Sequence, residues 1–454
     1  MAAVDTTIVL LALPTITSSL HTDLLSSIWV LLAYMIVISV LSTQAGRIGD
    51  LFGKGKIYNL GFVIFTAASA LCGISANIDM LIIFRIIQAI GGAMLVANSS
   101  SIVADVFPPD RRGKAYGITS LGWNIGALVG IILGGVLTTF LGWQYIFYIN
   151  VPIGIAAVIL GMMNIKDISK INTKLDIHGA ILLGISLGLI SLSLMFIAAS
   201  GISTDSVIEL ILGIVLIPFF LLNEIRSRYP IINLKVFKIR LLAYSILANF
   251  LQGIGGLSLS FLLIMYLQGV RGLSPLDSSL LLTPSYVIAS ILAPFMGKVA
   301  DRGKPGVVAG IGLIFIFITL ILYFFLLTPI TNYYLIVGIS AITGIGSAMF
   351  WPSNSTAIMF YAPKEYYGSV SGLSRTLGNI GTILSYVLSI VVATLSIPRN
   401  VAFEIFIGTT TLNGDVSATF VNGLHFAFLI SSIIIVIAMI FSFMSGKTKE
   451  SVTK

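Results

Sequence analysis

Long apolar runs dominate the sequence and constrain its fold more than any other feature. A helix needs about 20 apolar residues to cross ~30 Å of hydrocarbon, and thirteen runs reach roughly that length, with a shorter one over residues 1–18. Barrel strands need only about 10 residues and alternate in polarity, and the runs do neither. They therefore predict an all-α polytopic membrane protein. The thirteen runs lie near residues 24–45, 57–76, 79–106, 115–137, 143–164, 176–199, 206–224, 242–270, 276–297, 306–327, 332–360, 367–395 and 421–445.

The scarcity of charge supports the same conclusion. Only 9% of the 454 residues are charged and 57% are apolar, whereas a soluble domain has about a quarter of its residues charged. This composition excludes a cytosolic enzyme and a free nucleic-acid binder, and one cysteine excludes a disulfide scaffold. No phosphate loop, HExxH or GxSxG motif is present, and three scattered histidines do not predict a metal site. We expect neither an enzyme nor a cofactor, so uphill work would draw on a proton gradient.

The cations are placed on one side of the predicted membrane. When the short run 1–18 is counted as the first, 21 of the 25 Lys and Arg residues follow even-numbered runs, the last run included. Positive charge is enriched on the cytoplasmic side of membrane proteins. We therefore expect a multi-pass protein of the cell membrane with both chain ends in the cytoplasm. The net charge of +8 then reflects topology and the lipid bilayer, and we expect no nucleic-acid partner.

An internal repeat divides the chain. Residues 46–54 (GRIGDLFGK) recur as residues 297–304 (GKVADRGK), 251 residues later, and the Gly113–Gly117 spacing recurs 255 residues later as Gly368–Gly372. Repeats on this scale build many transporters from two related bundles. Since the offset exceeds half the length, extra sequence lies between the halves.

The repeat predicts a fourteen-helix arrangement. We expect two six-helix bundles with two additional transmembrane helices between them, and a first helix that lacks about fifteen residues of its repeat partner. The predicted parts are the N-terminal bundle 1–165, the additional helices and linkers 166–239, the C-terminal bundle 240–446 and a cytoplasmic tail 447–454.

The repeated segments join helices on the cytoplasmic side, and their recurrence favours a shared gating or latch role. Glycines permit a tight turn, and an acid can pair with a helix end. An ordinary positive loop is the alternative interpretation. The candidate latch residues are Gly46, Asp50, Gly53 and Lys54 in the first segment and Gly297, Asp301, Arg302 and Gly303 in the second.

Glycines recur at four-residue spacing in one run. Such a stripe lets a neighbouring helix backbone approach closely, so we expect a packing seam that also lets bundles slide or bend. The residues are Gly117, Gly122, Gly126, Gly130, Gly134 and Gly135.

Ionisable groups inside apolar runs are costly and point to function. Asp5 would bind and release a proton if it lies near mid-helix, or would be solvated if it lies at the mouth of the helix. Arg85 could snorkel to the interface, but Gln88 lies on nearly the same face and favours a cavity. Arg375 lies about nine residues inside its run, and a cavity role is the better interpretation.

Uncharged polar and aromatic residues also interrupt the runs. Helix-to-helix hydrogen bonds or interfacial anchoring explain about half of them, and the others suit an amphipathic pocket for lipophilic ligands. They are Trp29, Tyr34, Asn98, Asn124, Asn249, Gln252, Tyr286, Trp351, Asn354 and Asn379.

Together these motifs resemble the fourteen-helix drug:proton antiporter branch of the major facilitator superfamily. The resemblance implies two six-helix bundles that rock about a central cavity, beside two added helices. It also implies proton coupling at Asp5 and Arg85 and inter-bundle latches at Asp50 and Asp301. It is carried by residues 5–14, 46–56, 85–93, 117–135 and 143–154.

Three functions are consistent with these features. The leading hypothesis is a proton-coupled exporter of small lipophilic compounds, monomeric and working by alternating access. The second is a transporter of one native metabolite, lipid or siderophore, moved by uniport or symport. The intramembrane charges favour an anionic cargo for this option, since Arg85 and Arg375 outnumber the single acid Asp5. The third is a non-transporting membrane sensor or scaffold.

Overall fold

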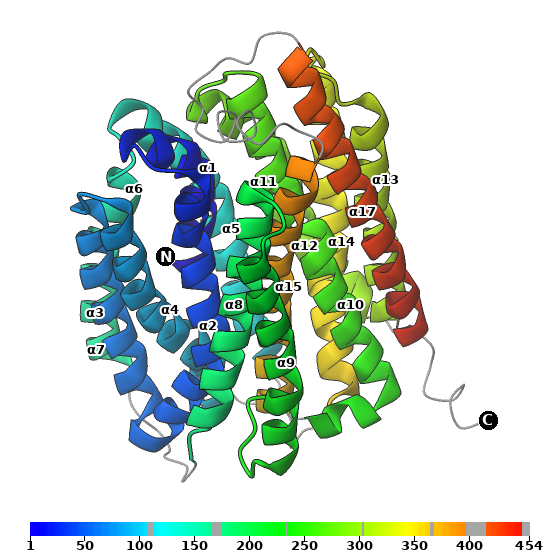
Figure 1. The fold of residues 1–454 in the computed structure, drawn as a ribbon. Coiled ribbons are helices and arrows are strands. Elements are labelled where there is room, and N and C mark those ends of the chain that lie inside the picture. The colour runs from blue at the N-terminus through cyan, green and yellow to red at the C-terminus, as the bar shows by residue number, and fades with distance from the viewer. Residues whose placement is uncertain are drawn as a thin grey trace. The chain divides into compact units, whose positions relative to one another are not determined.

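The computed structural model describes residues 1–106, 112–165, 174–232, 234–301, 304–363, 367–395 and 415–446. Within these ranges the chain forms helices and no strand (Figure 1). Thirteen helical segments of the described chain are long and apolar enough to cross a membrane, and residues 3–19 form a shorter apolar helix. The prediction of an all-α polytopic protein is confirmed.

The described helices fall into two compact units. The first covers Met1–Phe196 and Ile202–Ile232. In it α1 packs against α5, α4 lies against both α2 and α3, and α3 also contacts α7, while α6 and α7 together form one span. Its helices are α1 Ala2–Ser19, α2 Leu24–Phe52, α3 Lys54–Gly73, α4 Ile78–Val106, α5 Arg112–Phe140, α6 Tyr145–Tyr148, α7 Asn150–Asn164, α8 Ile177–Ser200 and α9 Thr204–Arg226.

The second unit covers Asn233–Lys454 with Ile197–Gly201. Here α10 packs against α15 and α17, α14 lies against both α12 and α13, and α13 also contacts α17. Its elements are the 3-10 segment η1 Leu234–Lys238, α10 Arg240–Gly256, α11 Ser258–Met265, the π-helical η2 Tyr266–Val270, α12 Pro275–Asp301, α13 Pro305–Leu326, α14 Tyr333–Tyr361, α15 Tyr367–Leu395 and α17 Asp415–Ser445.

The helices of the two units repeat at the offsets seen in the sequence. The starts of α2 and α12, and those of α3 and α13, are 251 residues apart, and the starts of α4 and α14, and of α5 and α15, are 255 apart. The contacts repeat too, since α3 lies against α4 as α13 lies against α14, and α1 against α5 as α10 against α15. The added helices α8 and α9 belong largely to the first unit. The predicted boundaries at 165/166 and 239/240 stay a prediction.

Local sequence explains where several helices begin. The Asp23 carboxylate accepts the Ser26 N–H at 2.6 Å and caps α2. Ser203 and Ser206 form a reciprocal capping box at the start of α9. These side chains take up N–H groups that a helix start leaves without an intrahelical partner.

The first repeated segment differs from the prediction of a loop over residues 46–56. Helix α2 continues to Phe52 and α3 begins at Lys54, so Gly53 alone connects them. Gly53 has φ 116° and ψ 122°, a conformation that only glycine adopts without strain. The segment is therefore helical on both sides of one sharp corner, and Asp50 and Lys54 pair across it at 3.5 Å.

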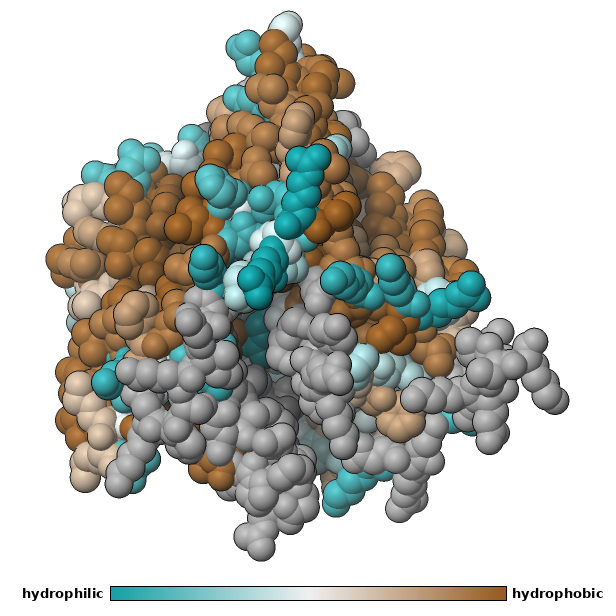
Figure 2. All heavy atoms as spheres, turned by 90° about the horizontal axis from the view of Figure 1, so that it is seen from below, coloured by the Kyte–Doolittle hydropathy of each residue, from teal (hydrophilic) through white to brown (hydrophobic). Residues whose placement is uncertain are grey.

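Apolar side chains cover the outer surface of the helices. Figure 2 shows hydrophobic atoms over much of the sides and hydrophilic atoms gathered on the face turned to the viewer. On α9, for example, Ile214, Val215 and Phe219 are exposed. Such a surface is suited to hydrocarbon rather than to water.

Candidate proton-coupling site

A buried ion pair links the first and fourth helices of the first unit. Asp5 lies in the first turns of α1 and Arg85 in α4, and both are fully buried. The Nη1 atom of Arg85 lies 2.6 Å from Oδ2 of Asp5. Removing a charged group from water costs on the order of several kcal/mol. Two isolated charges could therefore not be buried here without partners that offset this cost. The pair is the reason both can occupy an apolar interior.

Gln88, one turn beyond Arg85 on α4, completes the network. Its Oε1 accepts a hydrogen bond from Arg85 Nη1 at 2.6 Å. Its Nε2 donates to Oδ1 of Asp5 at 3.0 Å and to the Ser69 hydroxyl of α3 at 2.7 Å. Cys72 Sγ lies 4.0 Å from the same Oε1. Both oxygens of Asp5 are therefore engaged by α4.

Arg85 makes two further contacts with α2. Its Nε donates to the Val30 carbonyl at 3.0 Å, and its guanidinium carbon lies 4.0 Å from the centre of the Tyr34 ring. Phe147 of α6 lies farther off, at 5.8 Å. The Tyr34 hydroxyl is buried without a hydrogen-bond partner in the described chain. Arg85 thus keeps a carbonyl, an amide and an aromatic face as partners even if Asp5 loses its charge.

The glycine stripe of α5 lies against the helix that carries Asp5. A Cβ atom on Gly126 would lie 3.1 Å from Ala3 Cβ, and one on Gly134 would lie 3.0 Å from Ile8 Cγ1. Between them, a Cβ on Gly130 would come within 2.8 Å of the Val4 carbonyl oxygen. The absence of side chains lets α1 and α5 pack backbone to backbone. Outside this seam, Gly122 has open space around it.

Comparison with known proteins identifies the family of this chain. The sequence model of the Major Facilitator Superfamily matches residues 1–386. The chain belongs to the Major Facilitator Superfamily. The family resemblance of the sequence is thereby confirmed.

Three curated relatives show the range of the superfamily that this chain is similar to. The riboflavin transporter RibZ of Clostridioides difficile is 31% identical over 389 residues, which cover 85% of this chain and 83% of the relative. The tetracenomycin C resistance and export protein of Streptomyces glaucescens is 29% identical, covering 86% and 73%. The multidrug transporter protein MdtP of Bacillus subtilis is 29% identical, covering 84% and 70%.

Solved structures share the fold. A bacterial homolog of the human lysosomal transporter Spinster, in an inward-facing and occupied conformation, aligns with a TM-score of 0.63 at 16% identity, covering 99% of this chain and 94% of that one. The chain is thus a superfamily transporter and not an enzyme, which leaves the non-transporting alternative without support.

The other candidates in the first unit lie apart from this network. Asn98 is fully buried, and its Nδ2 donates to the Ala45 carbonyl at 3.2 Å and to the Met94 carbonyl at 2.9 Å. It therefore ties α4 to α2 beside Gly46, and its Oδ1 is buried without a partner among the described residues. Trp29 is half-buried. The side chain of Asn124 and the surroundings of Gly117 lie outside the described features, whereas Gly135 is buried.

In the second unit, four polar candidates lie on α10 and α15, two helices that pack against each other. The Asn249 amide donates to the Ser374 carbonyl at 2.9 Å. Gln252 is buried and its Oε1 has no partner in the described chain. Arg375 and Asn379 are half-buried on α15.

Three further candidates lie on α12 and α14. Tyr286 is half-buried, and Asn354 is buried with an Oδ1 that has no partner among the described residues. Trp351 is 37% exposed and packs edge-on against Phe350, which suits an outward-facing anchor better than a pocket.

The second latch segment is helical where it is described. Gly297 and Asp301 belong to α12, which ends at Asp301. Nothing is described of the Asp301 side chain, and Arg302 and Gly303 lie outside the described residues. The predicted latch role of this segment stays a prediction.

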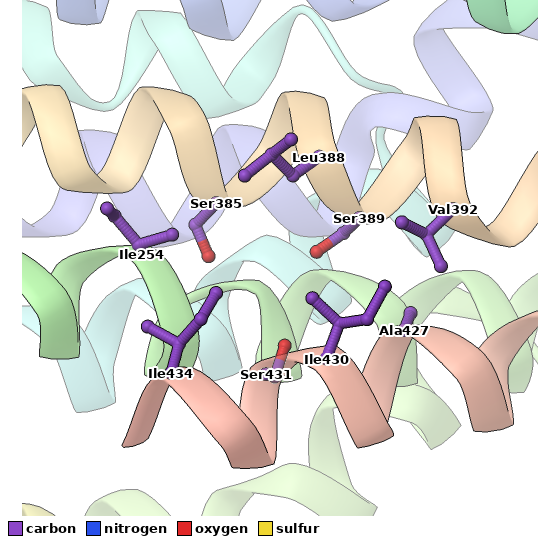
Figure 3. Close-up of a pocket in the computed structure, with 9 residues that line it drawn as sticks. All are labelled: Ile254, Ser385, Leu388, Ser389, Val392, Ala427, Ile430, Ser431 and Ile434. Atoms are coloured by element: carbon purple, nitrogen blue, oxygen red, sulfur yellow. The ribbon is translucent and has the colours of Figure 1, made fainter. Parts of the chain in front are cut away.

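A small pocket lies between α10, α15 and α17. Figure 3 shows the hydroxyls of Ser385 and Ser389 on one side and that of Ser431 on the other, among aliphatic side chains. The Ser385 hydroxyl accepts the N–H of Ser258 at 2.9 Å, where α10 gives way to α11. This serine supports the broken helix, because it supplies a partner to a backbone donor that the break leaves free.

Sequence reasoning did not find Ser69 or the Val30 carbonyl. A serine in an apolar run forms a hydrogen bond to its own helix in many proteins, and Ser69 does so with Phe65. A backbone carbonyl leaves no trace in the sequence. Only the packing of α2 and α3 around Arg85 identifies both.

Proposed function

We propose that this transporter is a proton-coupled exporter of small lipophilic compounds that works by alternating access. The observation that carries the proposal is the buried Asp5–Arg85–Gln88 network. An ionisable pair in a membrane span is costly and marks ion or proton pathways. In this network Asp5 is paired directly with Arg85, and through Arg85 and Gln88 it is linked to α2 and α3.

In the proposed cycle Asp5 takes up the proton. Protonation removes its negative charge and with it the attraction to Arg85 across 2.6 Å. Arg85 then keeps only Val30, Gln88 and the Tyr34 ring as partners. This weakens the tie between α1 and α4, and the glycine seam lets α1 move along α5 without displacing side chains. Release of the proton restores the pair and resets the first unit.

The proposed cargo follows from the relatives and from the sequence. Two of the relatives carry names of a drug-resistance exporter and a multidrug transporter. Aromatic side chains such as Tyr286 would stack on such compounds, and amide side chains such as Gln252 and Asn379 would form hydrogen bonds with them. We further propose that the protein works as a monomer in the cell membrane. The distribution of its cations supports an orientation with both chain ends in the cytoplasm.

Reconstituted transport tests the coupling. Proteoliposomes that hold an imposed pH gradient should accumulate ethidium with the unchanged protein and should lose that accumulation when an ionophore collapses the gradient. Asp5→Asn should lose gradient-driven uptake, because an amide cannot exchange a proton. Asp79→Asn, at an exposed acid of α4, is the matched control and should transport normally. Undiminished flux without a gradient, or a fully active Asp5→Asn, would overturn the proposal.

A second candidate is a transporter of one native metabolite that carries a negative charge. Two observations favour it: a relative is named a riboflavin transporter, and Arg375 lies half-buried in α15 without an acidic partner among the described residues. Riboflavin and its 5′-phosphate form a matched neutral and anionic pair of competitors. If the cargo is anionic, riboflavin 5′-phosphate should inhibit ethidium uptake more strongly than riboflavin does. Arg375→Gln should remove this difference in inhibition.

A further inference from the structure

Glu224 near the end of α9 is a buried acid that the proposed transport cycle does not use. It is 3% exposed. Its Oε2 accepts the N–H of Ile232 at 2.5 Å, so it fastens the segment 227–232 that follows the helix. Its Oε1 is buried and has no hydrogen-bond partner in the described chain. A buried carboxylate oxygen without a hydrogen-bond donor is unfavourable for the charged form of the acid.

A second carboxylate lies beside that free oxygen. Asp176, just before α8, is 7% exposed, and both its oxygens accept the Asn223 amide at 3.1 Å. A Cβ atom on Gly179 would lie 2.8 Å from Glu224 Oε1 and 3.0 Å from Asp176 Cγ. Both acids therefore converge on the same glycine at the start of α8, whose N–H donates to Asp176 at 2.9 Å.

One half-buried cation faces this pair. Arg47 of α2 acts on both acids, but its guanidinium donates to the carbonyls of Tyr229 and Pro230, at 2.7 and 2.5 Å. The other charged group of α2 near Arg47 is Asp50.

Asp50 does not supply the missing positive charge. It is itself paired with the buried Lys54, at 3.5 Å. No further cation from α2 or α8 acts on Glu224 among the described residues. Two buried acids thus share one cation, and one negative charge stays uncompensated.

We propose that Glu224 is a second proton-binding site, which together with Arg47 forms a clasp that holds segment 227–232 to α2. A single proton on Glu224 balances the charge of the cluster and turns its unpartnered oxygen into a group that can donate to Asp176, whose carboxylate has lone pairs to spare.

The clasp also ties the added helices to the bundle. Gln44 of α2 exchanges two hydrogen bonds with the backbone of Asp176, each at 3.1 Å. Segment 227–232 leads directly to η1 and α10. The proton state of Glu224 therefore governs how firmly the connection leaving α9 is held.

The direction of the pH response follows from the charge balance. The protonated cluster is neutral and holds the segment. Loss of the proton leaves two buried negative charges side by side, which weakens the packing of α8 and α9 on α2. The clasp should therefore loosen as pH rises through the range in which Glu224 loses its proton.

A spin label placed in the segment tests this response. Arg228 is exposed, so Arg228→Cys on a Cys72→Ser background carries the label in the full-length, reconstituted protein. The mobile fraction of its spectrum should rise at least twofold from pH 6 to pH 8. Glu224→Gln, which keeps a neutral side chain, should hold the low value at both pH values. Asp205→Asn, at an exposed acid of the same helix, should respond like the unchanged protein.

Two results would overturn the proposal: a mobile fraction that is constant from pH 6 to pH 8 with Glu224 present, or one that rises equally in Glu224→Gln. Infrared difference spectra give a readout that needs no label. The spectra of the parent protein at low pH should contain one protonated-carboxyl band that the spectra of Glu224→Gln lack, and this difference between the two proteins should disappear as pH rises; identical carboxyl bands in both proteins would refute the site.

Discussion

The guanidinium of Arg85 and the carboxylate of Asp5 meet at 2.6 Å with neither residue exposed to solvent. They come from helices 80 residues apart in the sequence. The pair explains how an apolar interior keeps two charges, and it makes each residue depend on the other for stability.

The first prediction separates these two roles. Removing one partner of a buried ion pair costs about 3–5 kcal/mol, because the other charge stays buried alone. Asp5→Asn and Arg85→Gln should each lower the melting temperature in detergent. The double variant should recover much of that loss, since no charge remains, yet should still fail to couple transport to protons. Additive losses in the double variant would show that the two residues do not act as a pair.

The second prediction concerns the glycine seam. Gly130→Ala places a methyl group against the Val4 backbone, and such overpacking costs about 1–3 kcal/mol. Gly122→Ala is the matched control, because nothing lies within 4 Å of the new methyl and alanine favours helix. Thermal unfolding should therefore show a loss for the first variant and none for the second. Equal melting temperatures would place α1 farther from α5.

The third prediction concerns Gly53. A residue with a Cβ atom is strained at φ 116°, at a cost of about 1–3 kcal/mol. Gly53→Ala should unfold at a lower temperature than the parent protein. Gly188→Ala, within α8 where nothing lies within 4 Å, tests the same change without the strained backbone and should not be destabilised.

The fourth prediction concerns the break between α10 and α11. Ser385→Ala removes the acceptor of the Ser258 N–H, and a buried donor left without a partner costs about 1–3 kcal/mol. Ser389→Ala removes a hydroxyl one turn along the same helix, facing the same pocket (Figure 3). Only the first variant should lower the melting temperature. A larger effect of Ser389→Ala would mean that the pocket rather than the broken helix depends on these hydroxyls.

The sequence predicted the fold well because membrane spans can be recognised from the length and polarity of their apolar runs alone. It also selected Asp5, Arg85 and Gln88, since charges inside apolar runs stand out. It did not predict that they meet, because Arg85 and Asp5 lie on helices whose packing depends on contacts far apart in the chain. Ser69 was invisible for the same reason.

Two errors have a common cause. The predicted runs place Gly53 inside a longer connection between two helices, and they give no reason to expect a buried acid at Glu224, near the end of a run. In both cases the deciding feature is backbone conformation: a single glycine turns the chain, and a segment after α9 folds back to cover the acid. Polarity patterns report burial along one helix and carry little information about how its ends connect.

The corner at Gly53 has a mechanical consequence. With a single residue between them and the Asp50–Lys54 bridge across the junction, the end of α2 and the start of α3 cannot separate. Any displacement of one of these ends therefore carries the other with it, and the angle between the two helices can change only at Gly53.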